Sequence, residues 1–141
     1  MSVDSGSASM AARLGVKPGM VVQELGWDED ADEDLRDSIV DVSGGDMVEE
    51  DSDEVADIVV LWFREQDGDL IDTLLDSLGA LADDGVVWLL TPKSGRPGHV
   101  EPGEVTEAAP TAGLQQTSSI SAAKDWAGIR LVTPKAARSR R

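Results

Sequence analysis

Three short apolar runs constrain what this sequence can fold into more than any other feature. They read VVQEL at 21–25, IVVLWF at 58–63 and VVWLL at 86–90, and turn-forming residues flank the runs. A strand with one face in water alternates apolar and polar residues, whereas a strand buried on both faces is a nearly continuous apolar run. The three runs therefore predict buried strands of a parallel sheet.

Helical patterns lie between and after these strands. Residues 69–81, DLIDTLLDSLGAL, place leucine and isoleucine at three- and four-residue spacing, which predicts an amphipathic helix. Asp69 stands where the N-cap of that helix belongs, because its side chain can accept hydrogen bonds from the first turn. Weaker patterns predict helices over 32–42 and 105–114.

The order of the elements predicts the fold class and the domain boundaries. Residues 117–122 and 129–133 read as two further strands that form an antiparallel hairpin. Alternating strands and helices ahead of it predict a single α/β domain over 11–134, with a Rossmann-like, mainly parallel sheet flanked by helices. The polar segment 1–10 is expected to be a disordered N-terminal tail, and the basic segment 135–141 a mobile C-terminal tail.

Composition excludes several classes of function. The chain has 141 residues, no cysteine, one histidine and a net charge of -16. The lack of cysteine excludes disulfides, thiol nucleophiles and thiolate metal sites, and the single histidine excludes a multi-histidine metal site. Because nucleic acid is a polyanion, the charge argues against nucleic-acid binding. Without a membrane-spanning run or a signal pattern, we expect a cytoplasmic protein with no membrane partner.

The segment 28–57 concentrates the negative charge. From position 27 to position 57 the sequence has fifteen acidic residues and one basic residue, Arg36. Its alternate aspartates resemble the start of a calcium loop, but Glu33 and Ile39 stand where that loop needs glycine and glutamate. We therefore predict no metal site. Two interpretations stay open, a solvated repulsive surface or a face that attracts a divalent ion or a basic protein partner.

Candidate binding residues gather where the three predicted strands end. In an open parallel sheet, ligands bind at the carboxyl ends of the strands, so the loops after these strands converge on one edge. The charged, polar or glycine residues there that we predict to bind a ligand are Glu24, Gly26, Arg64, Asp67, Lys93, Arg96 and His99. We assign no catalytic residue, because no serine or cysteine nucleophile motif accompanies the histidine.

The loop 91–102, TPKSGRPGHVEP, has two interpretations. In the first, Arg96 binds a phosphate or carboxylate with its guanidinium fork, and His99 acts as an acid or base. In the second, Lys93 and Arg96 neutralise the acidic loops beside them, and the prolines and glycines set the path of the loop.

The residues 14–27, LGVKPGMVVQELGW, resemble the opening of S-adenosylmethionine-dependent methyltransferases, which has a turn, a strand, an acidic residue and a glycine-rich loop. The chain keeps Glu24 and Gly26, and then has carboxylates at 28–30 where further glycines are expected. The sequence has no well-placed second strand that ends in an acidic residue able to bind the ribose of the cofactor. The segment 41–57 holds at most a vestigial strand. The resemblance implies a methyltransferase-like fold with a degenerate cofactor loop. We predict no cofactor.

The chain also resembles, from 14 to 135, an uncharacterised bacterial family, domain of unknown function number three thousand and fifty-two. The resemblance is carried by the blocks LGVKPGMVVQELGWDED, VVLWFREQDGDLIDTLLD, GVVWLLTPKSGRPGHVEP, EAAPTAGLQQTSSISAAKDW and GIRLVTPK. These blocks look most like the actinobacterial branch of the family. The resemblance implies one α/β domain and no transferable activity.

Two functions are consistent with the sequence. The first is a non-enzymatic binding or regulatory module on a degenerate methyltransferase-like scaffold, which binds a protein partner through its acidic face or a small ligand. The alternative is a transferase that acts on an anionic substrate near Lys93, Arg96 and His99. The oligomeric state is open, and a hairpin edge such as 129–133 makes a dimer one outcome.

Overall fold

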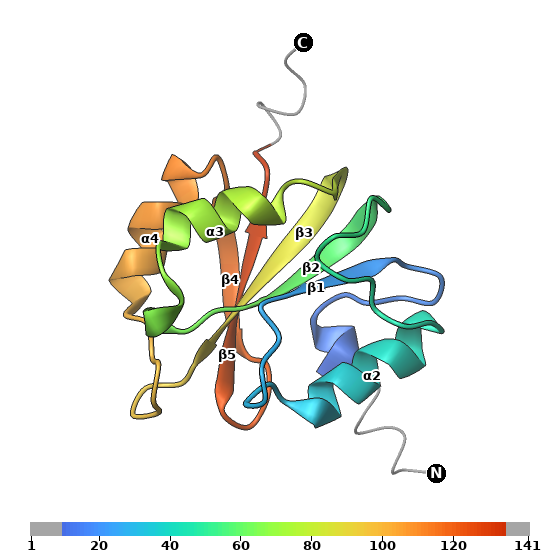
Figure 1. Cartoon of the computed structure of the whole chain (residues 1–141), viewed down its shortest axis with the longest axis horizontal. Coiled ribbons are helices and arrows are strands. Elements are labelled where there is room, and N and C mark those ends of the chain that lie inside the picture. The colour runs from blue at the N-terminus through green and yellow to red at the C-terminus, as the bar shows by residue number, and fades with distance from the viewer. Residues whose placement is uncertain (1–9, 135–141) are drawn as a thin grey trace.

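The computed structural model describes residues 10–134, which form one five-stranded sheet with helices on both faces (Figure 1). The sheet order is β1-β2-β3-β5-β4. The strands are β1 (Val22–Leu25), β2 (Ala56–Trp62), β3 (Leu81–Pro92), β4 (Gln115–Ser121) and β5 (Trp126–Val132). The three continuous apolar runs therefore become β1, β2 and β3, as the sequence predicts.

The sheet is mixed rather than purely parallel, with four of its five strands running in one direction and β5 running against them. β1 pairs with β2 and β2 with β3 in parallel, whereas β5 pairs antiparallel with both β3 and β4. The predicted C-terminal hairpin is confirmed, but the expectation that 129–133 forms an edge is wrong. The second strand of the hairpin lies between β3 and the first strand, so β4 is the edge of the sheet.

The helices divide between the two faces of the sheet. They are α2 (Glu33–Ser43), the short 3-10 helix η1 (Glu65–Asp67), α3 (Leu70–Ser77) and α4 (Pro102–Thr111). α3 and α4 pack on one face against alternate strand residues such as Val59 and Leu61. α2 and the helical turn at 10–13 pack on the other face, against Val60 and Trp62. Both faces of the central strands are therefore buried, which explains their continuous apolar sequence.

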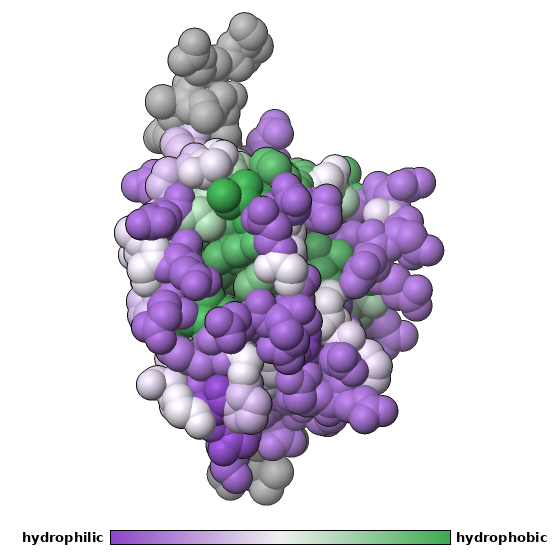
Figure 2. Space-filling view, turned by 60° about the vertical axis from the view of Figure 1, so that its left-hand side comes forward, coloured by the Kyte–Doolittle hydropathy of each residue, from purple (hydrophilic) through white to green (hydrophobic). Residues whose placement is uncertain are grey.

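The helix predicted over 69–81 is confirmed but ends earlier. The Asp69 side chain accepts hydrogen bonds from the first turn, as expected of an N-cap, and the helix ends at Ser77. Leu81 belongs to β3, where it pairs with Ala56. Leu75 is 48% exposed, and Figure 2 shows apolar surface ringed by hydrophilic residues on the side that carries α3 and α4.

The predicted tails at 1–10 and 135–141 lie outside the described residues, except for Met10, which is helical and packs against the core. Within residues 10–134, every helix is too short or too polar to cross a membrane.

Neighbouring leucines of α3 test the packing. Leu74 is fully buried and Leu75 is 48% exposed. We expect Leu74→Ala to lower the free energy of unfolding by about 2–5 kcal/mol, because it leaves a cavity in the core. Leu75→Ala should lower it by about 0.5 kcal/mol or less. Urea unfolding of both variants measures the difference, and equal losses would contradict the packing of α3.

Candidate functional site

The carboxyl ends of β1, β2 and β3 bring the predicted binding residues to one edge. Glu24 ends β1 together with Leu25, and Gly26 follows it. After β2, Arg64 precedes η1 and Asp67 is its last residue, and the loop after β3 reaches this turn because Glu65 N donates to the carbonyl of Gly98. The convergence of loops predicted from the sequence is therefore present.

The Glu24 carboxylate is held by partners from two other elements. Arg36 of α2 donates to it through Nε at 2.7 Å and through Nη2 at 2.8 Å. The indole Nε1 of Trp62 donates to the same carboxylate at 3.0 Å. The hydrogen bonds that Arg36 donates to Glu24 raise the pKa of Arg36. The Glu24 side chain is only 10% exposed, and both of its carboxylate oxygens accept hydrogen bonds within the chain.

Gly26 is required by close packing at the turn after β1. Its φ of +75° lies in the left-handed region, and a Cβ built there would stand 2.3 Å from the carbonyl oxygen of Trp62. Its N–H donates to a carboxylate oxygen of Glu50 at 2.9 Å. The glycine therefore lets the loop cross the end of β2, and its amide is already engaged within the chain.

Arg64 is buried and connects the loop after β1 to the end of β2. Its guanidinium donates to both carboxylate oxygens of Asp30, to the carbonyl of Gly26 at 2.8 Å and to Asp67 at 3.1 Å. It also lies 5.2 Å from the ring centroid of Trp126, a favourable cation–π distance. Burial lowers the pKa of Arg64, but the hydrogen bonds with Asp30 and Asp67 outweigh it and raise the pKa overall.

The cations of the loop after β3 also face groups of the chain. Arg96 lies 3.4 Å from Asp125, and the His99 Nδ1 lies 2.9 Å from the carbonyl oxygen of Pro92. Lys93 makes no ion pair with residues 10–134. The second interpretation expects both cations to neutralise acidic groups beside them; within residues 10–134 Arg96 makes such a pair and Lys93 does not.

Exposed Trp27 separates two open hollows along this edge. Trp27 is 49% exposed, and the Arg36 guanidinium lies 5.6 Å from its ring centroid. One hollow, of about 500 Å³, is lined by Leu25, Gly26, Trp27, Asp28, Glu50, Leu61, Trp62, Arg64, Asp67, Thr73 and Asp76. The other, of about 570 Å³, is lined by Glu24, Trp27, Arg36, Met47, Val48, Glu49, Glu50 and Asp51. Carboxylates predominate among the charged side chains of both hollows.

The residues of this edge do not fit S-adenosylmethionine. In the resembling methyltransferases a glycine-rich loop lets the backbone approach the cofactor. Here two amides of the loop are engaged within the chain, since Gly26 N donates to Glu50 and Glu29 N to Asp28. The carboxylates at 28–30 crowd the loop, and Arg64 holds it against the sheet through Asp30. A cofactor would have to displace these contacts.

The vestigial strand predicted within 41–57 is confirmed as a single bridge. Val48 lies beside β1 in parallel, where Val48 N donates to Val22 O and Glu24 N donates to Val48 O. The acidic residue two positions later, Glu50, binds the Gly26 amide. This side of the sheet therefore ends in a short acidic segment that packs onto the glycine turn.

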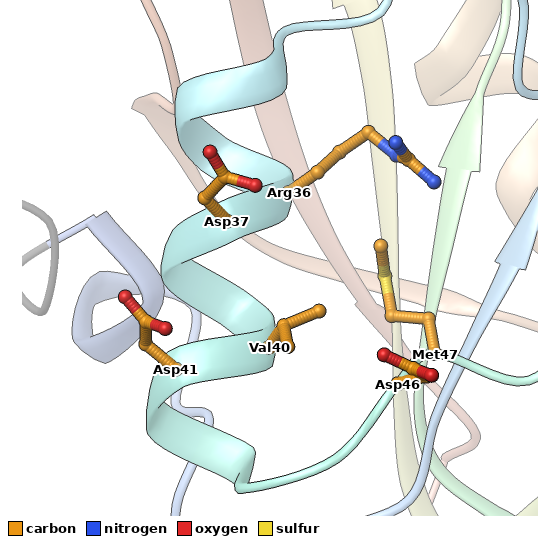
Figure 3. Close-up of a pocket in the computed structure, with 6 residues that line it drawn as sticks. All are labelled: Arg36, Asp37, Val40, Asp41, Asp46 and Met47. Carbon is orange, nitrogen blue, oxygen red and sulfur yellow. The ribbon is translucent and has the colours of Figure 1, made fainter.

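A third hollow, of about 500 Å³, lies between α2 and this segment (Figure 3). Val40 and Met47 are half-buried and supply its apolar lining. Asp37, Asp41 and Asp46 are exposed and also line it, and Figure 3 shows Asp37 and Asp41 on α2 and Asp46 beside Met47 on the segment. Arg36 of α2 completes the lining, which therefore combines apolar groups, carboxylates and one cation.

Four partners of the predicted residues were missed at the sequence level. These are Asp30, Arg36, Glu50 and Trp62. Arg36 carried a signal, because it is the single basic residue of the acidic segment. The others are separated from their partners by 24 to 38 positions, and no local pattern announces such pairs.

The glycine after β1 can be tested against a matched glycine. We expect Gly26→Ala to lower the free energy of unfolding by about 3 kcal/mol or more, because the added Cβ meets backbone. Gly95 also has positive φ, but a Cβ there meets nothing within 4 Å. Gly95→Ala should therefore cost only about 1–2 kcal/mol. Thermal or urea unfolding gives both values, and a tolerated Gly26→Ala would refute the close crossing.

The ion pair of Asp30 and Arg64 predicts a dependence of stability on pH. The hydrogen bond from Arg64 lowers the pKa of Asp30 in the folded state. Asp30 therefore adds stability above its unfolded pKa of about 3.9, and this contribution is lost as the pH falls through the lower folded pKa. Relative to wild type, Asp30→Asn should be destabilised at pH 7 and progressively less so below about pH 4.

The matched control is Asp53→Asn, because the exposed Asp53 carboxylate makes no hydrogen bond or ion pair within residues 10–134. Urea unfolding at a series of pH values measures both variants. A constant stability difference between wild type and Asp30→Asn down to about pH 2.5 would contradict the lowered pKa.

Solved structures with a similar fold include methyltransferases. A S-adenosylmethionine-dependent methyltransferase from Aquifex aeolicus superposes with a TM-score of 0.60 at 13% identity, over 89% of this chain and 88% of that one. The glycopeptide N-methyltransferase MtfA superposes with a TM-score of 0.59 at 15% identity, over 93% of this chain and 90% of that one. The fold is therefore the Rossmann-like methyltransferase fold, as the sequence predicts, and identities this low show the fold alone.

Sequence relatives place the chain in a family. Uncharacterized proteins of Mycobacterium tuberculosis and Mycobacterium bovis are 51% identical to it over 135 residues, which cover 96% of this chain and 85% of each relative. The profile of a protein family of unknown function, DUF3052, matches residues 11–135. Nearly the whole described domain is thus covered, and the chain belongs to the DUF3052 family, with mycobacterial relatives, on a methyltransferase-like fold.

Proposed function

We propose that this chain is a non-enzymatic binding module that recognises a basic segment of a protein partner. The proposal rests on one observation. At the carboxyl ends of β1, β2 and β3, where methyltransferases of this fold bind their cofactor, the polar groups are bound by side chains of the chain itself. Glu24 is bound by Arg36 and Trp62, and the Gly26 amide is bound by Glu50. The scaffold of a methyltransferase is therefore kept while the groups that would meet a cofactor serve the fold.

The hydrogen bonds between Arg36 and Glu24 are strong for their environment. Arg36 makes a two-pronged, charge-assisted contact with Glu24, a geometry that holds both side chains in one orientation. Among residues 10–134, every buried side-chain nitrogen or oxygen has a hydrogen-bond partner. A ligand at this edge would leave some of these groups unpaired, which costs about 1–3 kcal/mol for each.

The partner is argued from an acidic face beside this edge. We define the acidic face as six of the exposed carboxylates of α2 and of the segment after it, Asp37, Asp41, Asp46, Glu49, Glu50 and Asp51. A field of one sign steers a partner of the opposite sign and raises its rate of association. The acidic face therefore favours a segment rich in lysine and arginine.

Apolar groups within the acidic face provide contacts beyond charge. Met47 and Val40 line the hollow between α2 and the following segment, and the exposed ring of Trp27 stands between the other two hollows. Arg36 already lies over this ring at 5.6 Å, so the ring accommodates a guanidinium. Exposed tryptophans with such surroundings are frequent anchors of protein interfaces.

A labelled basic peptide tests this proposal. We expect a nine-residue arginine peptide to bind wild type, and the triple variant Asp37→Asn, Asp41→Asn, Asp46→Asn to bind about tenfold more weakly, since each exposed charge contributes a fraction of a kcal/mol. Fluorescence anisotropy in about 0.1 M salt measures the affinity, and screening at higher salt should reduce the difference.

The matched control removes the same charge elsewhere. Asp72, Asp83 and Asp84 are exposed on other elements, so their triple asparagine variant has the same net charge as the test variant. It should retain nearly wild-type affinity. Equal weakening by both triple variants would show that only net charge matters, and would overturn a specific acidic face.

A further inference from the structure

The free edge of the sheet differs in charge from the rest of the molecule. Among residues 10–134, β4 pairs only with β5 and ends the sheet, and its residues are exposed except Ile120, which is half-buried. It lies within Ala108–Ala123, the longest stretch of the sequence without a charged residue. The chain as a whole carries a net charge of -16. An exposed, neutral edge on such a chain calls for an explanation.

An unpaired edge strand presents free backbone donors and acceptors, and monomeric proteins block such strands. Lysine, proline and inward-pointing charges are the common blocking devices, and β4 contains none of them. It has one irregularity, a shift of register against β5 between Gln116 and Ser118. The stretch from Ser118 to Ser121 follows this shift and pairs regularly with β5. It therefore offers a regular edge for a further strand.

The arrangement of charge favours a second copy as the occupant. The acidic segment 28–57 supplies α2 and the bridge to β1, and β1 is the opposite edge of the sheet (Figure 1). When two copies meet edge to edge through β4, their acidic edges lie as far apart as the sheets allow. Any approach through β1 would instead oppose two acidic segments. Repulsion between copies is therefore smaller for an approach through β4 than for one through β1.

We propose that two copies of this chain associate by antiparallel pairing of β4 with β4 of the second copy, which makes one continuous sheet. Antiparallel pairing of one strand with itself is compatible with a two-fold axis, the commonest symmetry of homodimers. The serine, threonine and glutamine side chains of β4 can hydrogen-bond across such a pair. An open hollow of about 630 Å³ beside β4, lined in part by Pro110, Leu114 and Pro134, adds apolar surface.

The size of the contact sets the strength of the dimer. One pair of seven-residue strands is smaller than a standard protein interface of about 1,600 Å². The dimer therefore dissociates on dilution. Raising the salt concentration should strengthen it, because the remaining repulsion between the two acidic bodies is screened.

Sedimentation velocity tests the proposal with wild type from about 10 μM to about 1 mM in about 0.15 M salt, where the screening length is about 8 Å. We expect a shift from monomer to dimer across this range, and more dimer at about 0.5 M salt. The double variant Ser118→Glu, Ser119→Glu places carboxylates on both faces of the edge. Its dissociation constant should rise about tenfold or more, because like charges oppose each other across the pair.

The control is Gln66→Glu, Ser94→Glu, which adds the same charge at exposed positions away from β4 and should dimerise nearly as wild type does. Circular dichroism of all variants checks that they fold. Should the β4 variant fail to fold, amide exchange of wild-type β4 at low and high concentration replaces it, with protection expected to rise on dimerisation. A monomeric wild type at about 1 mM, a dimer indifferent to the β4 charges, or unchanged β4 exchange would each overturn the proposal.

Discussion

The buried hydrogen bonds of the Glu24 carboxylate are the interaction on which this structure depends. They join β1 to α2 through Arg36 and β1 to β2 through the indole of Trp62. Arg64 then adds the loop after β1, the turn after β2 and the ring of Trp126 to the same assembly. The edge where a parallel sheet ordinarily receives a ligand is thus a network of internal ion pairs.

This network is the basis of our proposal that the chain keeps a methyltransferase fold without the usual cofactor site. Fold and function separate readily, because the sheet requires buried apolar strands while a cofactor requires free polar groups at the strand ends. Here the strands keep their continuous apolar sequence. The polar groups at the strand ends, among them Glu24 and the Gly26 amide, make hydrogen bonds within the chain. The acidic segment supplies both kinds of partner, Arg36 for the glutamate and Glu50 for the amide.

The sequence predicts much of the fold because burial on both faces leaves a continuous apolar signature, seen in β1, β2 and β3. The sequence could not predict which strand of the hairpin lies beside β3, since either strand can pair with β3. Leu81 fits a helical repeat but joins β3, because its pairing with Ala56 outweighs the local pattern. The candidate residues were found by type and position at strand ends. Their partners were not, because contacts such as Asp30 with Arg64 depend on the tertiary path of the loop.

The central claim is that internal contacts at the carboxyl ends of the strands exclude the cofactor. Its most direct test is a nuclear magnetic resonance titration with S-adenosylmethionine. The backbone amide of Gly26 and the indole N–H of Trp62 report the two contacts that close the edge. The account predicts that both signals stay unchanged up to about 1 mM ligand, in wild type and in Glu50→Gln alike. Saturable shifts of these two signals in wild type would show that the edge still accepts the cofactor, and would contradict the account.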